Sequence, residues 1–465
     1  MGFIYGLASV LIIFVAIIIQ CESAPVNDTE IDLPILPNDV IELIFSKADF
    51  ETILGAIREY IVPANDIVMS RILHDHIIYI APECNKKICA NYFGNMSIGN
   101  YEGLELFFEK FGDRVKKIQI DLEEVRDIQS EESDTKNDKS IQNIFKKCAK
   151  NLEELQIICF HDERFWKELS DGENDIIFPE VKKFQMKGDI CRNDFKLNLI
   201  FPKLETFNLV GSVDDVNCLE NVKGLKGLLL HTDSIEEDQL DLIFQNNKDM
   251  AMIYLNKPNR METLNSIAKH LTKLKKLAVQ SPGVNFMLRA NNGTVCKLPS
   301  VIQFGISFGE LGESFGMGDL SFDMPHLKRL TFDADQVDDR IINFIQHFKE
   351  LEIVDLIVEE YNGVNCIEKL KHIKEFTTLF HENEFDSLKN MFKNFDKTSK
   401  LQTLKFEDFD ESLYEMYEKE MKEINNELEN SMKPTWALSH EDLIGTGQQY
   451  LMFTREPCKC ESCKK

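Results

Sequence analysis

The stretch Phe201-Pro202-Lys203-Leu204-Glu205-Thr206-Phe207-Asn208-Leu209 decides the fold of this chain. Its apolar residues Leu204, Phe207 and Leu209 stand at offsets 0, +3 and +5, and the last three positions alternate between apolar and polar. Alternation of this kind is typical of a short strand with one buried face. The same phrase returns along the chain, so the pattern indicates a repeated unit before it indicates any activity.

The phrase occurs twelve times, and its successive starts lie 37, 29, 23, 21, 25, 24, 27, 26, 24, 22 and 28 residues apart. Most of these intervals fall within the period of roughly 20–29 residues that is typical of leucine-rich repeats. The twelve phrases begin at Val115, Leu152, Val181, Leu204, Leu225, Met250, Leu274, Val301, Leu327, Leu351, Ile373 and Leu401.

Several intervals between the phrases carry apolar residues at helical spacing, as at Leu264, Ile267 and Leu271. One strand and one helix cannot bury their apolar faces alone, whereas stacked units can. We therefore predict an α/β leucine-rich-repeat horseshoe over residues 100–410, with a parallel sheet on the concave side and helices on the convex side. The Asn that usually stands at offset +8 is absent, so the repeats are expected to be irregular.

Composition restricts the class of partner. The 465 residues are 43% hydrophobic, which is enough for a large core, and the formal net charge is −26. An acidic body of this size repels phosphate backbones, so we expect no nucleic-acid partner.

The N-terminus indicates secretion. Residues 2–20 carry no charge, Leu7 to Ile19 is an apolar run, and small residues follow at Ser23 and Ala24. We predict a signal peptide over residues 1–24 and no membrane attachment after its cleavage. An uncleaved signal anchor is the alternative, since a basic segment does not precede the run. Cleavage would remove Glu22 and Cys21, which changes the charge from −26 to −25 and the cysteine count from 12 to 11.

Secretion would permit two kinds of modification. Some of the cysteines should pair in an oxidising compartment, and Cys84 with Cys89 is the candidate disulfide closest in sequence. Three sequons predict N-glycosylation at Asn27, Asn95 and Asn292.

Residues 33–80 precede the repeats and are predicted to be helical. Leu36-Pro37-Asn38-Asp39-Val40-Ile41-Glu42-Leu43-Ile44-Phe45-Ser46 resembles the opening of an F-box, although the usual Val-Cys and downstream Trp are absent. The resemblance implies docking on a Skp-type adaptor of cullin–RING ubiquitin ligases. A helical cap over the end of the repeats is the alternative. The adaptor-binding candidates are Leu36, Pro37, Val40, Ile41, Ile44 and Phe45.

A signal peptide before an F-box-like segment and leucine-rich repeats is similar to the secreted proteins of parasitoid wasp venom. That resemblance implies a protein that mimics or blocks the substrate receptors of a host ubiquitin ligase. An extracellular recognition or scaffold protein and an intracellular F-box substrate receptor are the alternatives.

The C-terminal region follows the last repeat. Residues 411–432 show the spacing of an amphipathic helix, and residues 433–465 are expected to form a mobile, Cys-containing tail. The three cysteines Cys458, Cys460 and Cys463 lack a nearby fourth ligand for zinc. No hydrolase, metalloprotease or phosphate-loop motif is present, so the sequence predicts neither an enzyme nor a cofactor.

The concave face is the candidate site for a protein partner. Offset +4 of each phrase should point away from the core, and only two of its twelve residues are charged. A near-neutral to slightly basic face on an acidic body suits protein binding, although strand positions also disfavour Asp and Glu for their own reasons. The candidate partner-binding residues are Lys117, Lys183, Asn208, Tyr254, Lys276 and Arg329.

Overall fold

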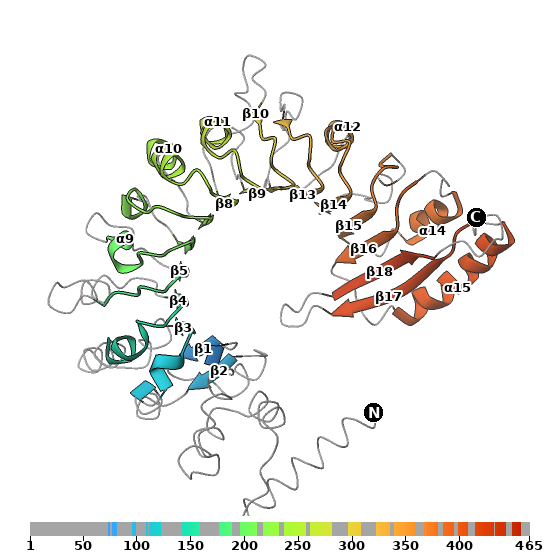
Figure 1. Ribbon diagram of the computed structural model, residues 1–465. Helices are drawn as coiled ribbons and strands as arrows, with labels where there is room; N and C mark the ends of the chain where they lie inside the picture. The colour runs from blue at the N-terminus through green and yellow to red at the C-terminus, as the bar shows by residue number, and fades with distance from the viewer. Residues whose placement is uncertain are drawn as a thin grey trace, which may run out of the picture.

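The structure is a computed structural model. It describes residues 73–74, 77–80, 95–98, 108–109, 111–121, 142–158, 176–187, 196–211, 217–231, 237–256, 261–280, 296–307, 322–334, 339–358, 367, 369–379, 385–394, 399–407, 414–431, 433–442 and 449–456. The elements form one curved array, with the strands along its inner side and the helices along its outer side (Figure 1). The predicted α/β class and predominantly parallel sheet are confirmed.

One 16-stranded sheet runs through the described residues, in the order β17-β18-β16-β15-β14-β13-β11-β9-β8-β7-β6-β5-β4-β3-β1-β2. All neighbours are parallel except β16–β18 and β17–β18. Its first eight strands are β1 (Ile77–Ile80), β2 (Asn95–Ile98), β3 (Lys117–Asp121), β4 (Glu154–Ile158), β5 (Lys183–Lys187), β6 (Thr206–Val210), β7 (Gly227–His231) and β8 (Met252–Asn256). The other eight are β9 (Lys276–Gln280), β11 (Gln303–Ser307), β13 (Arg329–Ala334), β14 (Ile353–Val358), β15 (Glu375–Leu379), β16 (Thr403–Glu407), β17 (Trp436–Asp442) and β18 (Gln449–Arg455).

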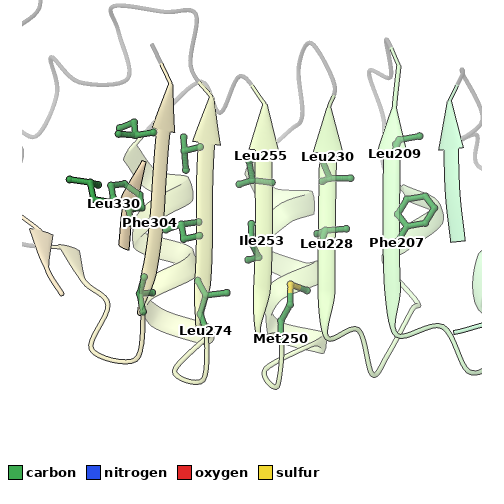
Figure 2. Packing of buried hydrophobic residues seen from close by; sticks show 14 of the residues in the cluster. Phe207, Leu209, Leu228, Leu230, Met250, Ile253, Leu255, Leu274, Phe304 and Leu330 are labelled. Carbon is green, nitrogen blue, oxygen red and sulfur yellow. The ribbon is translucent and has the colours of Figure 1, made fainter. Parts of the chain in front are cut away.

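All twelve phrases lie on strands β3 to β16, and they share one register. Phe207 of β6 pairs with Phe184 of β5 and with Leu228 of β7, so the offset +3 residues form one continuous row. Figure 2 shows this row and the parallel row of offset +5 side chains behind the central strands. Both rows are buried, because strand alternation sends these two positions to the same face.

From β4 to β16, each strand of the large sheet is preceded by the same pair of backbone hydrogen bonds. Two successive N–H groups donate to one carbonyl of the preceding repeat; for example, Glu205 and Thr206 both donate to Lys182 O, at 2.8 Å each. Lys226 and Gly227 then donate to Glu205 O in the same way, at 2.7 and 3.0 Å. This repeated junction fixes where each strand starts, so the phrases stay aligned although the connections between them differ in length.

At these junctions, lysine alternates along the array with glutamate or with an uncharged residue. Lys226 Nζ lies 2.7 Å from Glu205 Oε1, and Lys374 Nζ lies 2.8 Å from Glu352 Oε1. Equivalent positions of neighbouring parallel strands face each other, so like charges there would repel. Exposed pairs contribute little each, and their main effect is to disfavour a shifted register. The full row is Lys116, Glu153, Lys182, Glu205, Lys226, Ala251, Lys275, Ile302, Lys328, Glu352, Lys374 and Gln402.

The outer layer is mixed. Its elements are η2 (Gly112–Arg114), a helix over residues 142–148, α9 (Leu197–Ile200), η3 (Asn217–Leu219), α10 (Glu237–Asn246), α11 (Met261–His270), α12 (Asp339–His347) and α14 (Phe385–Asn394). A small parallel pair, β10 (Cys296–Lys297) with β12 (Phe322–Asp323), joins two adjacent repeats in this layer. The helices predicted from apolar spacing are present on the outer side of the arc (Figure 1). Their apolar faces and the helix-facing side of the sheet enclose one continuous core.

One buried polar side chain fastens two repeats together. Asn247, only 2% exposed, follows α10. Its amide nitrogen donates to Val222 O at 3.0 Å and to Ile243 O at 2.9 Å, and its oxygen accepts from the Leu225 N–H at 2.9 Å. Val222 and Leu225 precede β7, whereas Asn247 precedes β8. One side chain therefore satisfies backbone groups of two successive units.

The C-terminal region differs from its prediction. The amphipathic segment forms α15 (Tyr414–Asn430), which buries Tyr417, Met421, Ile424 and Leu428. However, residues 433–465 are not merely a tail, because β17 and β18 form an antiparallel hairpin that pairs with β16. The tail prediction was wrong for residues 436–442 and 449–455, where alternating apolar residues such as Leu451 and Phe453 enter the core.

α15 lies against the free edge of β17. The Arg455 N–H of β18 donates at 2.8 Å to the carbonyl of Gln402, which immediately precedes β16. Trp436 is the β17 residue paired with Arg455, and its backbone N–H and C=O therefore point away from β18. The Asn425 side chain of α15 binds both groups, donating to Trp436 O at 2.8 Å and accepting from its N–H at 3.0 Å. A side-chain amide thereby occupies the place of a further strand.

The N-terminal part also departs from expectation. Residues 33–80 were predicted to be helical, but β1 is a strand that pairs with β3. β2 pairs with the other side of β1, so the sheet begins before residue 100. A strand forms here in place of the predicted helix, because the β-branched residues Ile77, Ile78 and Ile80 favour a strand that extends the parallel sheet. The signal peptide, the adaptor-binding candidates, Cys84, Cys89 and the offset +8 positions lie outside the described residues.

Candidate functional site

The concave face presents three side-chain positions per strand. The buried rows occupy offsets +3 and +5, so offsets +2, +4 and +6 point to the opposite face. Strand β5 shows this alternation, with Lys183, Gln185 and Lys187 accessible and Phe184 and Met186 buried. All six predicted partner-binding residues lie at offset +2 or +4 of β3, β5, β6, β8, β9 and β13.

The basic residues of this face are largely balanced by carboxylates. Lys183 Nζ lies 3.4 Å from Glu154 Oε2 on the neighbouring strand, and Arg329 Nε donates to Asp355 Oδ2 at 2.8 Å. The face is therefore near neutral rather than basic. The sequence suggested a basic excess because the acidic partners stand in adjacent repeats, which only the strand register brings together.

The middle of the face is almost free of charge. We call the concave-face positions of β6, β7, β8, β9 and β11, at offsets +2, +4 and +6, the central strip, and Lys276 is its one charged residue at neutral pH. On both sides of the strip the same rows carry ion pairs. The central strip consists of Thr206, Asn208, Val210, Gly227, Leu229, His231, Met252, Tyr254, Asn256, Lys276, Ala278, Gln280, Gln303, Gly305 and Ser307.

Tyr254 is the largest side chain of the central strip and is held in place. Its ring stacks on the His231 ring with centroids 4.2 Å apart and an interplanar angle of 25°. Its hydroxyl donates to Gln280 Oε1 at 2.7 Å. Burial raises the pKa of Tyr254, with a further contribution from Asp333, and burial lowers the pKa of His231. At neutral pH both rings are therefore uncharged, and together they form a fixed aromatic surface.

Small residues stand next to Tyr254 in the same row. Ala278 and Gly305 occupy the next two positions of the same row, and a Cβ on Gly305 would meet Ala278 Cβ at 3.4 Å, an ordinary contact. At the other end of the row, the Asn208 side-chain oxygen is buried and has no hydrogen-bond partner among the described residues. Such an unsatisfied group costs free energy, and groups of this kind are frequent at functional sites.

The C-terminal part of the face is hollowed. This hollow has a volume of about 370 Å³. Its floor is formed by short side chains at offset +4 of three neighbouring strands, and longer side chains surround it. The lining residues are Arg329, Thr331, Asp355, Ile357, Glu375, Thr377, Lys405, Glu407 and Tyr450.

Polar contacts fix most of the lining of the hollow. Asp355, only 6% exposed, accepts the Arg329 Nε–H and also the Thr331 hydroxyl at 3.0 Å, both through Oδ2. Lys405 Nζ lies 2.9 Å from Glu375 Oε1. These contacts hold the charged lining residues in one arrangement.

Three other polar side chains line the hollow, and two of them bind each other. Glu407 Oε1 accepts the Tyr450 hydroxyl at 3.2 Å. Thr377 is only 3% exposed and lines the hollow, yet its hydroxyl has no hydrogen-bond partner among the described residues. The Thr377 hydroxyl is therefore available to form a hydrogen bond with a ligand in the hollow.

One cluster superficially resembles a catalytic triad. Asp241 of α10 accepts Ser266 Oγ at 2.5 Å and lies 3.2 Å from His270 Nε2, both through the same oxygen Oδ1. A relay would instead need the imidazole between the serine and the carboxylate. The Ser266 hydrogen bond, with His270 and Lys269 contributing, lowers the pKa of Asp241. The cluster joins α10 to α11 on the outer layer and has no nucleophile geometry.

The described cysteines are structural. Cys148 and Cys296 are free thiols buried in the core, and burial raises the pKa of both, to about 12 for Cys296. Neither is a thiolate at neutral pH, so neither is a nucleophile or metal ligand as it stands. Cys218 is disulfide-bonded.

The described residues contain no cluster of His, Cys, Asp or Glu suited to a metal ion. None of their helices combines the length and the apolar character that crossing a membrane requires.

Comparisons with known proteins add little. No protein-family model and no curated protein match the chain. Among solved structures, the crystal structure of a Bacteroides fragilis protein, a structural-genomics target, matches with 14% identity and a TM-score of 0.29. The match covers 65% of this chain and 82% of that one. A TM-score of this size does not establish a common fold, so function has to be argued from this chain's own residues.

Sequence reasoning missed part of this surface. It selected offsets +2 and +4, whereas His231, Gln280 and Glu407 stand at offset +6 on the same face. The period-2 alternation of a strand was the available signal, and extending it by two residues finds this row. The hollow could not be found in this way, because Tyr450 comes from the hairpin that was predicted to be a tail. Among the predicted glycosylation sites, Asn95 begins β2, and Asn27 and Asn292 lie outside the described residues.

Proposed function

We propose that this chain is a leucine-rich-repeat horseshoe that binds a protein partner on its concave face and performs no catalysis. The observation that carries the proposal is the central strip, a nearly uncharged surface on a protein with 28% charged residues and a net charge of −26. The twelve aligned phrases support the leucine-rich-repeat assignment.

The anatomy of the strip suits a protein partner better than a small molecule. The cores of protein interfaces are depleted in charged residues and enriched in aromatic residues, and they are surrounded by polar rims. Here Tyr254, Leu229 and Met252 lie centrally, and ion pairs flank them at Glu154–Lys183 and at Glu375–Lys405. Because His231 and Gln280 fix the Tyr254 ring, little conformational entropy is lost when a partner packs on it.

The substitution Ala278→Arg tests this proposal. It places a charged side chain next to Tyr254, at a strand position that is only partly buried, so folding should be retained while partner capture is lost. The measurement compares proteins retained from a candidate host extract by immobilised wild-type chain and by the variant, with melting temperatures recorded for both. We expect at least a tenfold loss of the retained partner, the scale of one interface hot spot.

Leu199→Arg is the matched control. Leu199 is 58% exposed on α9, in the outer layer, and the substitution adds the same side chain there. This variant should retain the partner as the wild type does. Equal losses from both variants, or a lowered melting temperature that accounts for the loss, would contradict binding at the central strip.

We further propose that the chain is secreted, with the uncharged run at residues 2–20 acting as its signal peptide. Outside the cell it would act, as a venom-type factor, on the substrate receptor of a host ubiquitin ligase. Sequencing the N-terminus of the natural protein tests secretion, and an intact Met1 would exclude cleavage. Binding of the full-length chain to a purified Skp-type adaptor tests the F-box-like segment. If the wild-type chain binds the adaptor and Ile41→Asp abolishes that binding, the segment is an adaptor site. If the wild-type chain does not bind the adaptor, the segment is left with the role of a cap over the repeats.

A further inference from the structure

We propose that the hollow at the C-terminal end of the concave face binds one cationic side chain, an arginine or lysine, of the protein partner. This inference rests on the proposed function and names a second contact of the same interface. It starts from the charges of the hollow. Among the lining residues, the carboxylates of Asp355, Glu375 and Glu407 outnumber the cations of Arg329 and Lys405 by three to two.

The surroundings increase this negative potential. Asp333 pairs in register with the lining residue Ile357 and adds a fourth carboxylate at the margin. Its oxygen accepts the Ser307 hydroxyl at 2.7 Å, a contact that leaves its charge in place. The whole chain carries a net charge of −26, which attracts cationic groups over a longer range. A cation is therefore the favoured occupant, and an anion is disfavoured.

The position of the two cations leaves room for a third. Arg329 is bound to the buried Asp355, and Lys405 is bound to Glu375, so each lies against its own carboxylate. Thr377 of β15 pairs in register with Asp355 of β14 and with Lys405 of β16, so it lies between these two charged side chains. Its hydroxyl lines the hollow and has no hydrogen-bond partner among the described residues. A guanidinium or ammonium group above Thr377 can donate to that hydroxyl and to the Glu407 carboxylate.

The shape of the hollow selects a side chain rather than a larger ligand. Its volume of about 370 Å³ is near the lower limit of small-molecule pockets, which span roughly 300–1,000 Å³. Ile357 provides an apolar wall for the methylene groups that precede the charge of an arginine or lysine. The hollow also opens on the same face as the central strip, so one partner can contact both.

A titration of the full-length chain with short peptides tests this site. The probe is Ac-Gly-Ala-Arg-Ala-Gly-NH2, compared with the same peptide carrying neutral citrulline and with free L-arginine, each followed by saturation-transfer difference NMR. We expect saturable binding of the arginine peptide and binding of the citrulline peptide weaker by roughly tenfold or more, the scale of a hydrogen bond to a charged group. Free L-arginine should bind more weakly than the peptide; equal or tighter binding would identify the ligand as the free amino acid and overturn the partner assignment.

Three variants locate the site. Glu407→Gln and Thr377→Val should each weaken binding of the arginine peptide severalfold. Thr377→Val should not lower the melting temperature, because the hydroxyl has no hydrogen-bond partner among the described residues. Glu180→Gln removes the same charge from an exposed ion pair with Lys203 ahead of β5 and should leave binding unchanged. Equal weakening by Glu180→Gln, equal binding of the citrulline peptide or the absence of saturation would each contradict the proposal. These outcomes are independent of the Ala278→Arg experiment, so the failure of one is distinguishable from the failure of the other.

Discussion

Asn247→Ala should destabilise the chain by about 2–4 kcal/mol, because it leaves several buried backbone groups without partners. The wild-type side chain donates to Val222 O and Ile243 O and accepts from Leu225 N–H, and it is only 2% exposed. Alanine satisfies none of these groups, and the site is too enclosed for water to replace the amide freely. Urea unfolding followed by circular dichroism measures the loss.

The neighbouring residue provides a matched control. Asn246 is the last residue of α10; it is partly exposed, and its side chain donates one hydrogen bond, to Glu220 O at 2.8 Å. Asn246→Ala should therefore cost at most about 1 kcal/mol. Hydrogen exchange should increase first at β7 and β8 in the Asn247 variant, since stability in stacked repeats depends on nearest-neighbour contacts. A similar cost for the two variants would show that Asn247 does not fasten the repeats.

Asn425→Ala should make the chain self-associate more strongly than the wild type does. The side chain of Asn425 occupies both outward backbone groups of Trp436, and the Tyr414 hydroxyl donates to Leu438 O at 3.4 Å on the same strand. An edge strand with unpaired backbone groups is a template for pairing with another chain. We expect concentration-dependent sedimentation and a loss of stability of about 1–2 kcal/mol.

Asn426→Ala is the control on the same helix, since Asn426 is exposed. It should sediment as the wild type does and keep its stability. If Asn425→Ala also sedimented as the wild type does at every concentration, the amide would contribute stability without protecting the edge.

The sequence predicted the repeated strands well because their pattern is local. Each phrase carries its own alternation, and parallel stacking places Phe184, Phe207 and Leu228 in one row without further information. The hairpin at β17 and β18 escaped prediction for the opposite reason. Its strands follow no phrase, and they become stable only by pairing with β16 and by packing under α15.

The candidate site was predictable only in part. Tyr254 and Asn208 follow from the period of the strand, which fixes the face that each residue occupies. The neutralisation of Lys183 by Glu154 does not follow, since the two residues are 29 positions apart and meet only through the register of β4 and β5. The hollow depends on Tyr450 and on three short side chains aligned across strands, so tertiary structure alone reveals it.

Site-specific photo-cross-linking tests the central claim most directly. Replacing Tyr254 by p-benzoylphenylalanine puts a light-activated group in the central strip, and replacing Leu199 puts the same group in the outer layer. After irradiation with the captured partner, binding on the concave face predicts a covalent adduct from position 254 and none from position 199. An adduct from position 199 alone, or from neither position while the partner stays bound, would contradict it.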